Sequence, residues 1–125
     1  MAANQRAPTL LWALFGFDGR VNREVFWLGN FGIAFAAMAI LLPGLDPDTG
    51  QLAITPVSPF VFAIYLWAEL ALAAKRLHDR SLTGWLVFLF AVPIVNIIAF
   101  FAIGLMPGDS GPNAHGKSTN QRGPV

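Results

Sequence analysis

The chain has 125 residues, of which 55% are hydrophobic and 12% are charged, whereas a soluble domain carries roughly 25% charged residues. This composition excludes a disordered chain and argues against a soluble domain, because too little charge remains to cover a water-exposed surface. The net charge of +1 provides no footprint for nucleic acid, and the absence of cysteine excludes disulfides and a thiolate nucleophile. The length fits one domain, which we place at residues 1–117, followed by a polar tail at 118–125.

The first apolar run, Leu10 to Phe17, is too short to cross a membrane, since a helix of that length spans only about 12 Å. No small-residue cleavage pattern follows it, which argues against a cleaved signal peptide. We expect an interfacial segment that lies on the membrane and is anchored by Trp12. The alternative is an apolar arm that packs on the helix bundle.

Three longer apolar stretches follow, and each approaches the roughly 20 residues that a helix needs to cross the hydrocarbon core. They cover about 25–42, 57–74 and 85–106. Pro43-Gly44 ends the first, Lys75-Arg76 the second and Pro107-Gly108 the third. Because backbone groups inside a bilayer must be satisfied internally, we predict an all-α membrane protein with three transmembrane helices and an irregular, polar C-terminal tail.

Lysine and arginine in short loops predict the orientation. They gather before the first span and between the second and third spans: Arg6, Arg20, Arg23, Lys75, Arg76 and Arg80. The loop 44–56 has none, so we expect the N-terminus to be cytoplasmic and the tail, after three crossings, to lie outside. As an alternative, Pro93 and Asn96 break the third segment into a re-entrant hairpin that returns the tail to the cytoplasm.

Three polar residues fall within the predicted spans: Asn30, Glu69 and Asn96. Glu69 is the one ionisable residue that we single out there, and a charge near the bilayer centre costs about 2.5–3.5 kcal/mol on insertion scales. Depth along the helices predicts that Asn30 approaches Glu69. Two roles stay open for Glu69: a hydrogen bond between helices, or an ion or proton site.

Polar residues concentrate at the expected cytoplasmic end. The candidate cluster consists of Arg20, Arg23, Arg76, His78, Asp79 and Arg80. One interpretation is an ion-pair network that ties two loops together; the other is a site for an anionic lipid head group. Catalysis by His78 and Asp79 is not expected, since adjacent helical residues do not face each other. We expect no metal or cofactor, because His115 falls on the other side of the membrane in the three-span topology.

Three segments carry a family resemblance. Residues 17–27 contain a Gly-Arg pair, a second arginine and Phe-Trp; residues 75–85 contain Arg-Leu-His-Asp and Thr-Gly-Trp; residues 108–116 follow the pattern Gly-x-x-Gly-x-Asn-x-x-Gly. In these segments the chain resembles the domain of unknown function 805 family of small bacterial inner-membrane proteins, from about residue 10 to 117. The motif residues are Gly19, Trp27, Gly84, Trp85, Gly108, Gly111, Asn113 and Gly116. The sequence departs from the family pattern at Ser81, Thr83, Ala114 and His115.

The resemblance implies a multi-pass bacterial inner-membrane protein and implies no activity. We expect a non-enzymatic protein that acts at its cytoplasmic face through membrane lipid, including anionic head groups, through a second copy or through a membrane-complex partner. The alternative function is an oligomeric small transporter or channel subunit that uses Glu69 as an intramembrane ionisable site.

Overall fold

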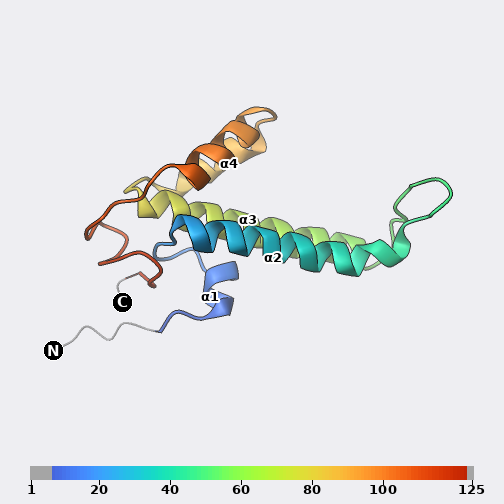
Figure 1. Ribbon diagram of the computed structural model, residues 1–125, viewed down its shortest axis with the longest axis horizontal. Helices are drawn as coiled ribbons and strands as arrows, with labels where there is room; N and C mark the ends of the chain where they lie inside the picture. The colour runs from blue at the N-terminus through green and yellow to red at the C-terminus, as the bar shows by residue number, and fades with distance from the viewer. Residues whose placement is uncertain (1–6, 124–125) are drawn as a thin grey trace.

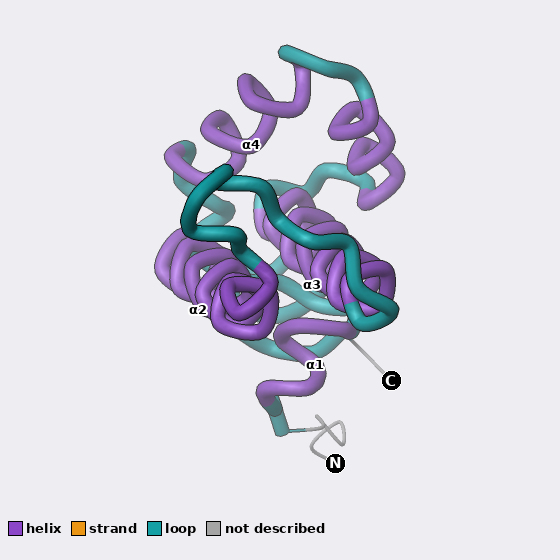
Figure 2. The backbone as a smooth tube through the Cα atoms, turned by 90° about the vertical axis from the view of Figure 1, so that its right-hand side faces the viewer, coloured by secondary structure: helices purple, strands orange, loops and turns teal. Residues whose placement is uncertain are grey.

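A computed structural model describes residues 7–123, and this part of the chain is helical, with isolated bridges but no strand. The elements in chain order are α1 (Leu10–Phe15), α2 (Arg23–Leu41), a short 3-10 turn η1 (Leu42–Gly44), α3 (Ser58–Asp79), the 3-10 helix η2 (Gly84–Ala91) and α4 (Val95–Leu105). Figure 1 shows α2 and α3 as a long antiparallel pair joined by the loop 45–57. In Figure 2, α1 lies on one side of this pair, and η2 and α4 lie on the other.

Local sequence signals account for the ends of α2. Asn22 Oδ1 accepts a hydrogen bond from Val25 N (2.9 Å), and Glu24 lies in the first turn, where the helix dipole favours an acid. The helix passes into η1 at Leu42, where Pro43 prevents further α-helical hydrogen bonding. The predicted first span, 25–42, therefore agrees with this element.

The prediction of one continuous helix over 85–106 is wrong. Helix η2 ends at Ala91, Ile94 takes a left-handed φ of 70°, and α4 begins at Val95. Pro93 explains the break, because it lacks an N–H and restricts the residue before it. The two halves fold back on each other as a hairpin beside α3, which is the re-entrant alternative (Figure 1).

This hairpin also corrects the position of the tail. Residues 109–123 lie against the segment before α2 and the end of α3, and Arg20 pairs with Gln121 in an antiparallel bridge. The expectation that the tail lies on the opposite side of the membrane from Arg20 is therefore wrong. The physical reason is that the third apolar segment folds back on itself at the break between η2 and α4.

Helix α1 packs against α3, and its Trp12 is buried at 4% exposure. Trp12 Nε1 donates to Asp18 O (2.8 Å), so the indole is part of the bundle and is not an interfacial anchor. Leu10 and Leu11, in contrast, are 75% and 73% exposed. The structure thus agrees with an apolar arm that packs on the bundle while its first turn remains uncovered.

The buried core occupies one end of the α2–α3 pair, where α1, the hairpin and the tail converge. Elsewhere large apolar side chains are exposed, as at Phe35 (76%) and Phe60 (69%), and such extended apolar surface indicates apolar surroundings.

Among the described residues one helical stretch, Arg23–Gly44, is long and apolar enough to cross a membrane, and α4 is a shorter apolar helix.

Candidate functional site

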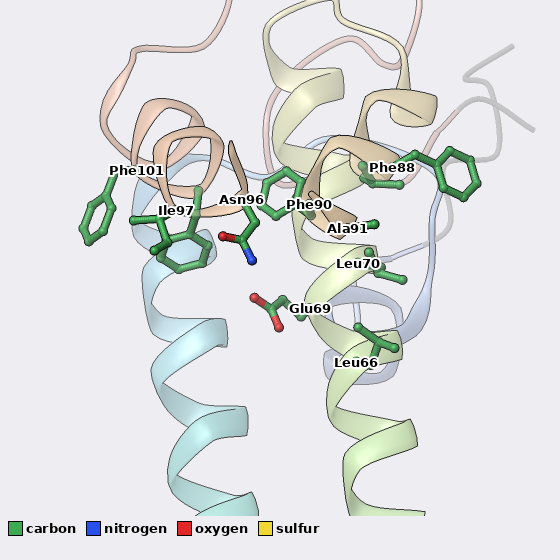
Figure 3. Close-up of a pocket in the computed structure, with 11 residues that line it drawn as sticks. Leu66, Glu69, Leu70, Phe88, Phe90, Ala91, Asn96, Ile97 and Phe101 are labelled. Atoms are coloured by element: carbon green, nitrogen blue, oxygen red, sulfur yellow. The ribbon is translucent and has the colours of Figure 1, made fainter. Parts of the chain in front are cut away.

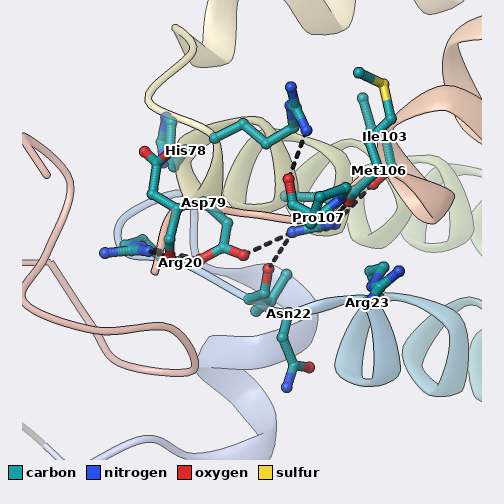
Figure 4. A network of polar contacts seen from close by, with 12 residues as sticks. Arg20, Asn22, Arg23, His78, Asp79, Ile103, Met106 and Pro107 are labelled. Atoms are coloured by element: carbon teal, nitrogen blue, oxygen red, sulfur yellow. Dashed lines mark hydrogen bonds and ion pairs between the residues drawn. The ribbon is translucent and has the colours of Figure 1, made fainter. Parts of the chain in front are cut away.

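Three buried charged side chains, here called the charge hub, join the segment before α2 to the end of α3. Asp79 accepts a hydrogen bond from Arg20 Nε at Oδ1 (2.9 Å) and one from Arg76 Nη1 at Oδ2 (2.7 Å). Both arginines are 0% exposed and Asp79 is 3% exposed. Figure 4 shows the polar contacts around Asp79. Because an unpaired buried charge is costly, each member of the charge hub depends on the others.

Arg20 holds the tail in place. Its Nη2 atom donates to Asp109 O (2.8 Å), and its Nη1 atom donates to Gly111 O (2.8 Å) and Gly116 O (3.2 Å). Asp109 N in turn donates to Asp79 O (2.6 Å). The guanidinium therefore satisfies three carbonyls of a loop that has no regular structure of its own.

The charge hub extends to the C-terminal end of α4, where five consecutive carbonyls accept hydrogen bonds from side chains. The donors are three arginines of the candidate cluster, one of which also belongs to the charge hub, and one tryptophan. These are Arg76 to Ile103 O (2.7 Å) and Met106 O, Trp27 Nε1 to Gly104 O (2.9 Å), Arg23 to Leu105 O (3.1 Å) and Arg80 to Pro107 O (2.5 Å). The last carbonyls of a helix lack partners in the helix itself, and its negative dipole end favours cations. The arginines thus act as a cap for the re-entrant helix.

His78 and His115 stack face to face with ring centroids 3.9 Å apart. The expectation that a membrane separates them is wrong, because the hairpin brings the tail back. His78 Nδ1 donates to Gly19 O (3.0 Å), and Asn113 Nδ2 donates to His78 O (2.9 Å). Burial, with a further contribution from His115, holds the pKa of His78 below its usual value.

Lys75, which the sequence interpretation left outside the candidate cluster, has a comparable structural role. Its Nζ donates to Trp12 O (2.8 Å), Ala13 O (2.7 Å) and Gly16 O (2.5 Å), and lies 5.1 Å from the centre of the Trp12 ring. Burial lowers the pKa of Lys75 to about 8. A lysine directly after an apolar helix was the available sequence signal, but nothing in the sequence identifies its acceptors.

Three of the motif glycines, Gly19, Gly84 and Gly108, are positions where chain segments approach closely. Gly19 has a left-handed φ of 91° and lies against the backbone at Gln121, and a Cβ on Gly108 would overlap the Asp79 carboxylate. A Cβ on Gly84 would lie 2.9 Å from His78 Nε2. Gly19 and Gly108 thus allow the tail to pack closely on the segment before α2 and on the charge hub. Trp85, by contrast, is 76% exposed and stacks on Phe88.

Most of the candidate cluster is therefore bonded within the protein, through ion pairs and through hydrogen bonds to backbone carbonyls. Arg20, Arg76 and Asp79 are buried and bonded within the protein, whereas Arg23 is exposed and Arg80 half-buried. This agrees with the interpretation as an ion-pair network between loops. Arg20 and Arg76 already use most of their N–H donors within the protein, so they offer few to an external head group.

The polar residues of the predicted spans form no hydrogen bond between Asn30 and Glu69 among the described residues. Asn30 is buried and donates to Phe26 O within its own helix (2.8 Å). Asn96, at the start of α4, instead points toward Glu69 of α3 across a shared space (Figure 3). The position of Asn96 follows from the break at Pro93.

This space is a cleft of about 500 Å³ between α3 and the hairpin, here called the Glu69 cleft. Apart from Glu69 and Asn96 its lining is apolar, and in residues 7–123 the Glu69 carboxylate makes no hydrogen bond or ion pair. The lining residues are Leu66, Glu69, Leu70, Val87, Phe88, Phe90, Ala91, Asn96, Ile97, Phe100 and Phe101. Between positions 7 and 123, no group of three or more histidine, cysteine or acidic residues is placed to hold a metal ion.

Fold and site together define a small helical protein with an apolar outer surface, an internal charge hub and one polar pair inside an apolar cleft. The chain belongs to the family described as Protein of unknown function (DUF805), which matches residues 14–117. This confirms the resemblance.

Relatives in Escherichia coli K12 match over most of their length. The chain is 30% identical to the inner membrane protein YhaI over 81% of this chain and 83% of YhaI. It is 29% identical to the uncharacterized protein YiiR over 85% of this chain and 87% of YiiR. It is 26% identical to the inner membrane protein YhaH, over 81% and 84%. No solved structure matches the chain.

Proposed function

We propose that this protein is a non-enzymatic, multi-pass inner-membrane protein whose Glu69 cleft binds a small lipophilic molecule. Two relatives named inner membrane proteins and the exposed apolar surface support the location. The observation that carries the function is that Glu69 and Asn96 face each other inside an otherwise apolar cleft. Ligand sites commonly combine an apolar lining of several hundred Å³ with a few convergent polar groups.

The proposed topology has two crossings and a hairpin. Helix α2, with 19 residues, and the apolar part of α3 before Lys75 extend about 28 and 25 Å, within the range of roughly 17–25 residues that crosses the hydrocarbon core. The hairpin enters from the end that holds the charge hub and returns to it. Since arginines and Lys75 gather at this end and the loop 45–57 has no basic residue, the charge hub is placed in the cytoplasm.

Single-cysteine labelling tests this topology, and the natural chain contains no cysteine that would interfere. In intact cells, a membrane-impermeant maleimide is expected to label Asp48→Cys in the exposed loop and to spare Lys117→Cys in the tail until the membrane is permeabilised. The ratio of labelling before and after permeabilisation is the measurement. Labelling of both variants in intact cells would support three full crossings and contradict the hairpin topology.

Filling the cleft tests the function. Ala91 lines the Glu69 cleft, whereas Ala63 of α3 is exposed and is not a lining residue. Replacement by tryptophan adds the same bulk at both positions. We expect Ala91→Trp to lose at least tenfold of the lipophilic molecule that native mass spectrometry detects on the protein purified in mild detergent. Ala63→Trp is expected to retain it. Equal occupancy in the two variants would contradict the cleft as the binding site.

A further inference from the structure

We propose that the Glu69 cleft selects a lipophilic organic cation, an ammonium or phosphonium group on an apolar body, with Glu69 as its counter-ion. This inference rests on the proposed function and adds the class of ligand. Three observations carry it: the Glu69 carboxylate has no partner among residues 7–123, phenylalanines surround it, and Asn96 faces it.

The charge that balances Glu69 has to come from outside the protein. Lys75 and Arg76, the nearest cations along α3, lie six and seven residues away, about 9 and 10 Å along the axis. Lys75 Nζ is already bonded to three backbone carbonyls, and Arg76 is bonded to Asp79 and to backbone carbonyls. A carboxylate at this depth is stable only with a bound proton or a bound cation, because an isolated charge in an apolar medium is strongly disfavoured.

The rest of the lining favours an organic cation over a metal ion. Phe88, Phe90, Phe100 and Phe101 line the cleft, and the faces of aromatic rings attract ammonium-type cations while their edges bury apolar substituents. A small metal ion would need several oxygen ligands, whereas this cleft offers one carboxylate and one amide. A volume of about 500 Å³ lies in the range for a drug-sized molecule.

Binding of such a cation releases a proton. In the empty cleft the Glu69 carboxyl holds a proton; when the cation enters, the O–H bond breaks, the proton passes to water and the carboxylate pairs with the ligand. No titratable residue lies in α4, in η2 or in α2 beyond its first turn, and Tyr65 is the other titratable residue of α3 before Lys75. Affinity should therefore rise up to about tenfold per pH unit while the carboxyl is protonated in the empty cleft.

The test uses the full-length protein in lipid nanodiscs and two matched probes, tetraphenylphosphonium and the uncharged triphenylphosphine oxide. Isothermal titration calorimetry at pH 6, 7 and 8, repeated in buffers of different ionisation enthalpy, gives affinity and proton release together. We expect tetraphenylphosphonium to bind at least tenfold more tightly than the neutral probe, with release of up to one proton. Glu69→Gln should lose this preference, and the exposed Glu24→Gln should keep it.

The outcomes separate the two proposals. If both probes bind equally and without proton release, the cleft binds lipophiles but the cation preference is overturned. If neither probe binds and Ala91→Trp behaves like the natural protein, the proposed function fails as well. Proton release by the natural protein needs no variant, so the inference stays testable if Glu69→Gln does not fold.

Discussion

Replacing Asp79 by alanine is expected to destabilise the protein by roughly 3–5 kcal/mol, the cost of leaving buried charges without their partner. Asp79 is the carboxylate between Arg20 and Arg76, and both guanidinium groups are fully buried. Its loss leaves two positive charges facing each other. Through Arg20 it also loosens the tail, and through Arg76 it loosens the end of α4.

Unfolding by denaturant in detergent micelles, followed by tryptophan fluorescence, measures this effect. Asp79→Asn retains one hydrogen-bond acceptor without the charge, so its loss should be smaller than that of Asp79→Ala. Asp48→Ala, in the exposed loop, is the matched control and should change stability by less than about 0.5 kcal/mol. Equal stability of Asp79→Ala and Asp48→Ala would contradict the structural role of the charge hub.

Replacing Gly108 by alanine is expected to cost about 1–3 kcal/mol or more, because the added methyl group overlaps the Asp79 carboxylate. The backbone at Gly108 cannot retreat easily, since the next residue, Asp109, is bonded to Asp79 O and to Arg20. The same denaturant titration measures the loss. We also expect faster tryptic cleavage after Lys117, because displacement of Gly108 undocks the tail.

Gly111→Ala is the matched control, since a Cβ at Gly111 would meet no atom within 4 Å. Its stability should stay close to that of the natural protein. In an Asp79→Ala background the cost of Gly108→Ala should shrink, because the overlapping carboxylate is gone and the two changes are coupled. Additive costs would show that the methyl group acts elsewhere.

Features that depend on neighbouring residues were predictable from the sequence. The apolar stretch at 25–42 corresponds to α2 and η1, because apolar composition and the Asn22 cap act within a few turns of one helix. The second stretch, 57–74, lies inside α3, but the helix continues to Asp79. Charged residues end a membrane-compatible segment without ending a helix, and here Lys75, Arg76 and Asp79 find buried partners.

The candidate site was predictable only in its membership. The sequence pointed to Arg20, Arg76 and Asp79 as one cluster, and an ion-pair network was one of two interpretations. Which of them are buried depends on the tail, whose irregular backbone supplies acceptors that no periodic pattern reveals. The placement of Asn96 opposite Glu69 was also hidden, since the two residues lie on different helices.

By itself the sequence determined that this chain is helical and suited to lipid, because composition and apolar run length depend on residues close together in the chain. Only the tertiary structure decided whether the third segment crosses or returns. Pro93 permits either outcome, and the arginines that cap the end of α4 favour the return. The return of the third segment places the tail on the charge hub, His115 on His78 and Asn96 opposite Glu69. Such contacts between distant segments could not be read from the sequence, because they depend on which surfaces meet when the helices pack.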